Sequence, residues 1–245
     1  MFELNGKTAL IAGASRGIGL AIARAVAQAG ARTILAGRSI EKLKTEADAL
    51  KGEALELDVT ALTADTKLPD VDILINVAGT NIRKPFVDYS LDEYEHIMRT
   101  NLHGLALLTQ RVGARMIERG QGGKIVIIGS LASIVGLPWL AVYSMTKSAL
   151  AGLTRSLAAE WGRYGIQVNC IAPGFILTDL NRAMWQQPEM LQWLEGAQAI
   201  PRLGTPEDIA PLAVFLSGAV SNYITGQVIA VDGGYSTTAN WPFHP

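Results

Sequence analysis

Short apolar runs alternate with helical patterns along this chain, and that alternation restricts the possible fold more than any other feature. The apolar runs occupy residues 8–13, 32–37, 53–58, 72–79, 124–130, 165–174 and 226–234. Patterns typical of helices lie between most of them, at residues 18–29, 39–50, 91–119, 139–163 and 206–217. Apolar strands that alternate with helices indicate a parallel sheet covered on both faces. We therefore expect an α/β, Rossmann-type doubly wound sheet of about seven strands.

The whole chain, 1–245, is predicted to form a single domain. Its length and its 49% hydrophobic content suit one core, and we find no internal repeat and no Pro/Gly-rich linker. The segment 61–71 is too short and too limited by proline for a full crossover helix. We expect only a stub of helix there.

Charge and cysteine content restrict the partners and the compartment. The 21 basic and 22 acidic residues nearly cancel without forming a basic block, so a nucleic-acid partner is not expected. The uncharged stretch 125–146 is interrupted by Gly136 and Pro138, which favours a buried strand and a loop over a membrane span. The N-terminus lacks the features of a signal peptide. Cys170, the single cysteine, fits a reducing cytoplasm and is expected to be a buried structural thiol.

A glycine-rich turn follows the first predicted strand. Gly13, Gly17 and Gly19 lie where that strand turns into the first helix. Missing side chains let backbone N–H groups and the helix N-terminus approach a pyrophosphate. Glycines also serve tight turns and packing, so the spacing alone is weak, but its position in a βαβ unit predicts dinucleotide binding.

The end of the second predicted strand bears on the choice of cofactor. NAD enzymes usually carry an acidic residue there, which holds the ribose 2′-hydroxyl. This chain has Gly37 and then Arg38, and Arg16 of the glycine loop can approach the same place. Two guanidinium groups suit a 2′-phosphate, although exposed arginines are commonly just solvated. We expect NADP(H) to be preferred over NAD(H).

A tyrosine and a lysine lie four residues apart in the long predicted helix that follows the uncharged stretch. Tyr143 and Lys147 should share one helix face. A neighbouring ammonium favours the phenolate, which makes a phenol useful as an acid and base. Ser130 ends the preceding strand and could donate a hydrogen bond to a substrate oxygen while Tyr143 exchanges its proton. Either feature alone could be packing.

Motifs along most of the chain extend this interpretation. From about residue 4 to residue 236, the chain resembles the short-chain dehydrogenase/reductase family. The matching stretches are "GASRGIG", "LDV", "NVAG", "TNL", the serine of "IIGS", "YSMTK", "PGFILTD" and "ITGQVIAVDGG". Ala12 and Val77 depart from the family's usual residues.

The resemblance implies roles for particular residues. Asn101 would order a water that relays protons to Lys147 and would complete a catalytic tetrad with Ser130 and Tyr143. It also implies a homotetramer formed through the helices at 91–119 and 139–163. The residues expected to contact the cofactor are Gly13, Ser15, Arg16, Gly17, Ile18, Gly19, Arg38, Asp58, Val59, Asn76, Ala78, Gly79, Tyr143, Lys147, Pro173, Gly174, Ile176 and Thr178.

The substrate is suggested by two stretches, "GTNIRKPFVDYS" and "PGFILTDLNRAM". Within the family they are most similar to gluconate 5-dehydrogenases and related sugar-acid or polyol dehydrogenases. Arg83 is then a candidate to hold the substrate carboxylate, with Ser130 and Tyr143 at the reacting oxygen, but Arg83 and Lys84 could equally be a solvated pair. Residues 179–200 are expected to form a lid. Its large apolar side chains could cover substrate or pack on the core: Met184, Trp185, Met190 and Trp193.

Other functions stay open. A 3-oxoacyl-carrier-protein reductase is the main competitor. The arginines that such enzymes use for the carrier are replaced here by Gln121 and Tyr164, with Arg119 and Arg163 close by. A non-catalytic NADP-sensing protein would need the same glycine loop. A serine hydrolase is disfavoured because "GSLAS" lacks the GxSxG elbow. The scattered histidines give no metal signature, so no metal site is expected: His96, His103 and His244.

Overall fold

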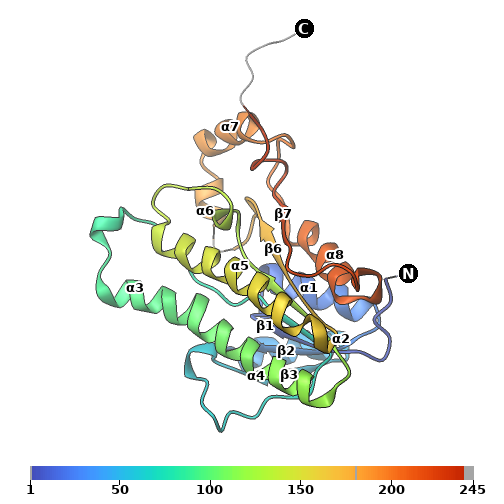
Figure 1. The fold of residues 1–245 in the computed structure, drawn as a ribbon. Helices are drawn as coiled ribbons and strands as arrows, with labels where there is room; N and C mark the ends of the chain where they lie inside the picture. The colour runs from blue at the N-terminus through green and yellow to red at the C-terminus, as the bar shows by residue number, and fades with distance from the viewer. Residues whose placement is uncertain (1, 180, 240–245) are drawn as a thin grey trace.

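The predicted parallel sheet is present in the computed structural model, which describes residues 2–179 and 181–239; His244 and the last residues of the chain lie outside the described residues. Seven parallel strands form one sheet in the order β3-β2-β1-β4-β5-β6-β7 (Figure 1). The strands are β1 (Thr8–Ala12), β2 (Arg32–Gly37), β3 (Glu53–Glu56), β4 (Ile73–Asn76), β5 (Gly123–Ile128), β6 (Ile166–Pro173) and β7 (Val228–Val231). The doubly wound single-domain α/β fold is confirmed.

The helices follow the expected pattern with three differences. They are α1 (Gly17–Gln28), α2 (Ile40–Leu50), α3 (Leu91–Met98), α4 (Gly104–Arg119), α5 (Ala141–Trp161), α6 (Arg182–Trp185), α7 (Pro188–Ala197) and α8 (Pro206–Ser217). A π-helical turn, Arg99–His103, joins α3 to α4 inside the predicted run 91–119. The stub expected at 61–71 is only a 3₁₀ turn, Val59–Ala61, that ends where the segment begins. The segment 179–200 contains two short helices, α6 and α7.

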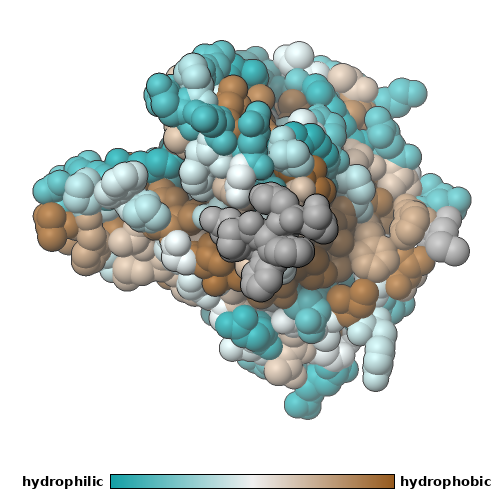
Figure 2. Space-filling view, turned by 90° about the horizontal axis from the view of Figure 1, so that it is seen from above, coloured by the Kyte–Doolittle hydropathy of each residue, from teal (hydrophilic) through white to brown (hydrophobic). Residues whose placement is uncertain are grey.

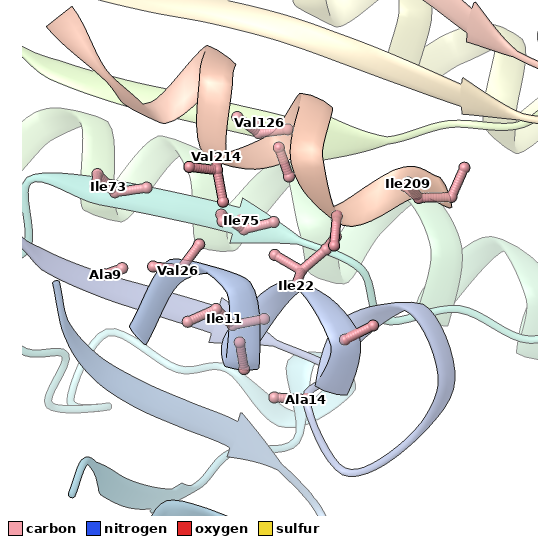
Figure 3. Close-up of a cluster of buried hydrophobic side chains, with 14 of the residues drawn as sticks. Ala9, Ile11, Ala14, Ile22, Val26, Ile73, Ile75, Val126, Ile209 and Val214 are labelled. Atoms are coloured by element: carbon pink, nitrogen blue, oxygen red, sulfur yellow. The ribbon is translucent and has the colours of Figure 1, made fainter. Parts of the chain in front are cut away.

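Alternate side chains of the central strands supply two cores, one on each face of the sheet. Ile11 of β1 and Ile75 of β4 belong to the core beneath α1 and α8 (Figure 3). Leu10 and Leu74, the preceding residues in the two strands, belong to the core beneath α4 and α5. This alternation follows from the two-residue period of a strand, and burial of both faces explains why the runs are almost wholly apolar.

The strand order reverses beside β1, whose neighbours are β2 and β4. In open parallel sheets, ligands bind at the carboxyl ends of the strands next to such a reversal. The loops that leave β1, β4, β5 and β6 at this edge carry most of the residues singled out from the sequence. The fold therefore brings together residues that are far apart in the chain.

The uncharged stretch 125–146 has the predicted strand-and-loop structure. It contains most of β5, a 3₁₀ turn at Leu131–Ser133 and the first residues of α5. Among residues 2–179 and 181–239, no helix is both long and apolar enough to cross a membrane.

Cys170 is a buried thiol, as expected. It lies in the middle of β6 and is inaccessible to solvent. Burial raises the pKa of the Cys170 thiol to about 11, although the positive charge of Lys147 acts in the opposite direction. Because the thiolate is the reacting form, both inaccessibility and the high pKa suppress its chemistry.

Native protein should therefore resist iodoacetamide at pH 8, whereas denatured protein should take up one label, as measured by intact mass. Asp65 is exposed in a loop, so Asp65→Cys is a matched control that should be labelled once in the native state. Rapid labelling of native wild-type protein would contradict this assignment.

Candidate active site

The catalytic candidates Tyr143 and Lys147 lie one turn apart on α5. Lys147 is only 3% exposed, and its Nζ donates a hydrogen bond to the Ile128 carbonyl at 2.9 Å. Ile128 is the last residue of β5, so this bond ties α5 to the carboxyl end of that strand. Lys147 Nζ lies 5.7 Å from the centre of the Tyr143 ring. The expected pairing of a cation with a phenol is therefore present.

The Lys147 ammonium has donors left for a ligand. It takes part in none of the salt bridges among the described residues. A Cβ placed on the exposed Gly79 would lie 3.7 Å from Lys147 Nζ and 3.5 Å from Asn101 Oδ1. A buried ammonium needs acceptors for its three hydrogens. The space beside Gly79 therefore suits a ligand rich in hydroxyl groups, such as a ribose.

Ser130 lies two residues after the end of β5 and is half-buried. Its backbone is extended, and its Oγ accepts a hydrogen bond from Ala132 N at 3.1 Å. The 3₁₀ turn that Ser130 caps packs against α5. Since the Ala132 amide is the donor in that bond, the Ser130 hydroxyl proton stays available to a substrate oxygen.

Asn101 is fully buried in the π-helical turn between α3 and α4. Its Oδ1 accepts from Thr80 N and its Nδ2 donates to Thr80 O, both at 2.8 Å. A longer contact of 3.4 Å joins Nδ2 to Thr146 Oγ1. Asn101 thereby fixes the loop that follows β4 against α5. Thr80 and Thr146 were not among the sequence candidates, although each stands within or beside a quoted motif.

The glycine loop has the features of a phosphate cradle. No described side chain caps α1, which is also true of α2, α5, α6 and α7. The first N–H groups of α1 have no side-chain acceptor among the described residues, and its first turn holds no acidic residue. A Cβ on Gly17, whose φ is +55°, would lie 3.6 Å from Thr178 Cγ2. The cradle is therefore flanked by the loop that follows β6.

Gly13 and Gly19 serve the packing of the turn itself. A Cβ on Gly13 would lie 2.7 Å from Ala78 N, and one on Gly19 would lie 2.1 Å from the Gly13 carbonyl oxygen. Neither position can hold a side chain unless the backbone moves. Ser15 and Ile18 between them are half-buried.

The arginines expected beside the adenosine, Arg16 and Arg38, are both exposed, and neither forms a salt bridge within the described residues. A Cβ on Gly37 would have only Leu43 Cδ1 within 4 Å, at 3.7 Å. Burial alone would raise the pKa of Asp58, but hydrogen bonds from Thr60 and the charge of Arg38 lower it. Arg38 therefore lies within electrostatic reach of the residue expected beside the adenine.

Two other residues expected to contact the cofactor, Asn76 and Val59, are buried. The Asn76 side chain is hydrogen-bonded to α4. Asn76 Nδ2 donates to Thr109 Oγ1 of α4 at 2.7 Å, and Val59 is buried beside Gly104 at the start of α4. Ala78 follows Asn76 closely and packs against Gly13. The Asn76 Oδ1 atom is buried and has no hydrogen-bond partner among the described residues, so contacts with a cofactor are expected from the backbone of Asn76.

The loop after β6 is held by a residue that was missed. Thr178 N donates to Asn181 Oδ1, and Asn181 Nδ2 donates to the Ile176 carbonyl, both at 2.8 Å. Pro173 ends β6 in a buried position, and a Cβ on Gly174 would lie 2.6 Å from Asp232 Cα. One residue separates Asn181 from the motif "PGFILTD", but a polar residue in a predicted lid gives no sequence signal of this role.

The large side chains of residues 179–200 were expected either to cover substrate or to pack on the core, and their exposure differs. Trp185 is 3% exposed, and Trp193 is 44% exposed. Both rings meet Phe175 edge-on at 5.4 Å, and Tyr235 meets it at 4.9 Å. Trp185 therefore packs on the core, and Trp193 closes the cluster from the solvent side. Met184 and Met190 are half-buried.

The two cations of the loop after β4, Arg83 and Lys84, differ in whether they form a salt bridge. Lys84 Nζ contacts both oxygens of Glu93, at 2.9 and 2.7 Å, and lies 5.6 Å from the centre of the Tyr89 ring. Glu93 also caps α3 with Ser90. Arg83 is exposed and forms no salt bridge within the described residues. Of the two, Arg83 is therefore the cation without a carboxylate partner among the described residues.

Comparisons with known proteins identify the family of the chain. A family model described as enoyl-(acyl carrier protein) reductase matches residues 13–236. The chain is 38% identical to gluconate 5-dehydrogenase of Gluconobacter oxydans (strain 621H), over 97% of this chain and 98% of that protein. It is 35% identical to a 3-oxoacyl-[acyl-carrier-protein] reductase of Aquifex aeolicus (strain VF5), over 95% and 98%.

A solved structure of a gluconate 5-dehydrogenase from Burkholderia cenocepacia J2315, in complex with NADP and tartrate, is similar with a TM-score of 0.92. It is 36% identical, and the match covers 97% of this chain and 98% of that one. The chain belongs to the short-chain dehydrogenase/reductase family of oxidoreductases.

Proposed function

We propose that this protein transfers a hydride between NADP(H) and a secondary alcohol or ketone, with a sugar acid or polyol such as gluconate and 5-keto-gluconate as substrate. The observation that carries the proposal is the buried Lys147 ammonium, bonded to the end of β5 and one turn from Tyr143. Relatives named gluconate 5-dehydrogenase support the substrate class.

The chemistry divides between the cofactor and the side chains. The nicotinamide, when bound, supplies or accepts the hydride. In reduction, Tyr143 donates its proton to the carbonyl oxygen while the Ser130 hydroxyl donates a hydrogen bond to the same oxygen. Lys147 favours the phenolate that Tyr143 then becomes, and its spare donors hold the nicotinamide ribose. Oxidation reverses these steps.

Asn101 has two parts in this scheme. Its side chain holds the loop after β4 in place. Its position in a π-helical turn changes the register of the helical hydrogen bonds there, so a backbone group can order the water that relays protons to Lys147. We propose that this relay connects Tyr143 to solvent.

NADP(H) is proposed over NAD(H) because the adenosine end offers Arg16 and Arg38 and no acidic residue at Gly37. The remaining cofactor contacts are proposed as predicted from the sequence, with the pyrophosphate at Gly17 and Thr178. The bound NADP of the Burkholderia cenocepacia gluconate 5-dehydrogenase supports this choice.

Carrier-protein reductase activity is the second candidate, since a 3-oxoacyl-[acyl-carrier-protein] reductase is among the relatives. Tyr164 is exposed and carries Arg163 over its ring at 5.4 Å, so one arginine is present near the place where such enzymes bind the carrier. A non-catalytic NADP sensor is the third candidate. Purified protein given NADPH and a panel of ketones and acyl carriers separates the three, because a sensor binds NADPH without consuming it.

The proposed assembly is a cytoplasmic homotetramer of single-domain subunits. In each subunit, residues 179–200 form a lid over the substrate. Exposed apolar side chains on the helices expected to meet support it: Leu91 of α3, Leu107 of α4 and Met145 of α5. Figure 2 shows hydrophobic surface along the projecting end of the molecule that carries α3. Such surface is typical of an interface.

Tyr143→Phe should retain NADPH affinity and lose at least about a hundredfold in kcat, because the ring remains while the proton donor is removed. Lys147→Ala should weaken both NADPH binding and turnover. Tyr164→Phe removes an exposed phenol elsewhere and serves as the control. Steady-state kinetics with a fluorescence titration of NADPH checks these outcomes, and a near wild-type kcat for Tyr143→Phe would refute the acid/base role.

Gly37→Asp combined with Arg38→Ala should shift kcat/KM from NADP toward NAD, since the new carboxylate accepts ribose hydroxyls and repels a 2′-phosphate. Only Leu43 lies near the added Cβ, at ordinary contact distance. Arg32→Ala removes a charge from the opposite end of β2 and should leave the preference unchanged. A wild-type enzyme that already prefers NAD would contradict the proposal.

Arg83→Ala should raise KM for 5-keto-gluconate by roughly tenfold to a hundredfold, because a charge-assisted hydrogen bond to the carboxylate is lost. KM for a neutral ketone should hardly change. Arg83→Lys keeps the charge and should recover part of the loss. Equal losses on charged and neutral substrates would show that Arg83 acts on folding or cofactor binding instead.

A further inference from the structure

Trp139 has a backbone conformation that is unfavourable for its side chain. Its φ is +62°, in the left-handed region that a bulky residue rarely adopts. Lys51 is the other described non-glycine residue with positive φ, and its conformation has an ordinary cause. Lys51 caps the C-terminus of α2, where a left-handed residue is common. Trp139 caps no helix C-terminus, since it precedes α5.

The side chain of Trp139 is also in an unfavourable place. The residue is 64% exposed, and its indole forms no aromatic pair with any other described residue. Core packing therefore does not compensate for the backbone conformation. Strained residues persist where the surrounding structure holds them, and they cluster at functional sites.

A hydrogen bond between two loops at the carboxyl ends of the strands holds Trp139 in this conformation. Its carbonyl accepts a hydrogen bond from Lys84 N at 3.2 Å, which joins the loop after β5 to the loop after β4. The first loop contains Ser130 and leads into α5, and Trp139 lies four residues before Tyr143. The second is fixed to Asn101 through Thr80. Trp139 therefore lies on the bridge between the two loops that flank the reacting groups.

We propose that the Trp139 indole is a substrate-contacting residue, on whose face the carbon chain of a polyhydroxylated substrate packs. Such a chain offers an apolar C–H edge, and the indole supplies a large rigid apolar face together with one N–H donor for a hydroxyl. This inference rests on the proposed function. It adds a contact to the carbon chain of the substrate, separate from the contact of Arg83 with the substrate carboxylate.

The test uses Trp139→Gly, because glycine readily adopts positive φ and keeps the carbonyl that Lys84 N needs. Trp139→Phe retains a smaller ring. Lys51→Gly is the matched control, since it relieves the same backbone conformation far from the site. KM and kcat are measured for 5-keto-gluconate and for the smallest ketone that wild-type protein reduces, together with NADPH affinity, Tm and mass by light scattering.

We expect Trp139→Gly to raise KM for the six-carbon substrate roughly three- to tenfold, with Trp139→Phe between it and wild type. KM for the smallest ketone and NADPH affinity should not change, and both glycine variants should melt no lower than wild type. An unchanged KM for the six-carbon substrate would overturn the inference. Equal losses for every substrate would also overturn it, because they would show that Trp139 only holds the loops in place. A smaller assembly for the variants would overturn it as well, because it would show that Trp139 contacts another subunit. Wild-type protein that reduces no polyhydroxylated ketone would instead refute the proposed function itself.

Discussion

The hydrogen bond from Lys147 Nζ to the Ile128 carbonyl is the contact on which the catalytic edge depends. It places an ammonium at 3% exposure beside the carboxyl end of β5, where the loss of water must be offset by polar partners. It also sets the position of α5, and with it Tyr143, relative to the strand that presents Ser130. A cation with unused donors in such a place can hold a ligand that brings further acceptors.

A second set of bonds gives this edge its rigidity. Asn101 holds both backbone groups of Thr80, and the Lys84 amide joins the same loop to Trp139. Glu93 anchors Lys84 and at the same time caps α3. Contacts within the chain itself therefore hold the two loops together, and donors held in this way stabilise developing charge most effectively.

The parts of this arrangement that are local in sequence could be predicted, and those that depend on tertiary contacts could not. Strand number and the facing of Tyr143 and Lys147 follow from short periodicities. The partner of the Asn101 side chain, the anchoring of Thr178 by Asn181 and the left-handed conformation of Trp139 depend on segments that meet only in the fold. Periodicity likewise could not separate Trp185, which is buried, from Trp193, which is largely exposed.

The central claim, hydride transfer at this edge, is tested most directly by the fate of an isotope. NADPH carrying deuterium at both C4 positions, incubated with the protein and a ketone that it reduces, should yield an alcohol with deuterium on the carbinol carbon, as read by mass spectrometry and NMR. Transfer of that deuterium is what the arrangement of Ser130, Tyr143 and Lys147 predicts. Alcohol without deuterium, or bound cofactor that is never consumed with any ketone, would contradict the account.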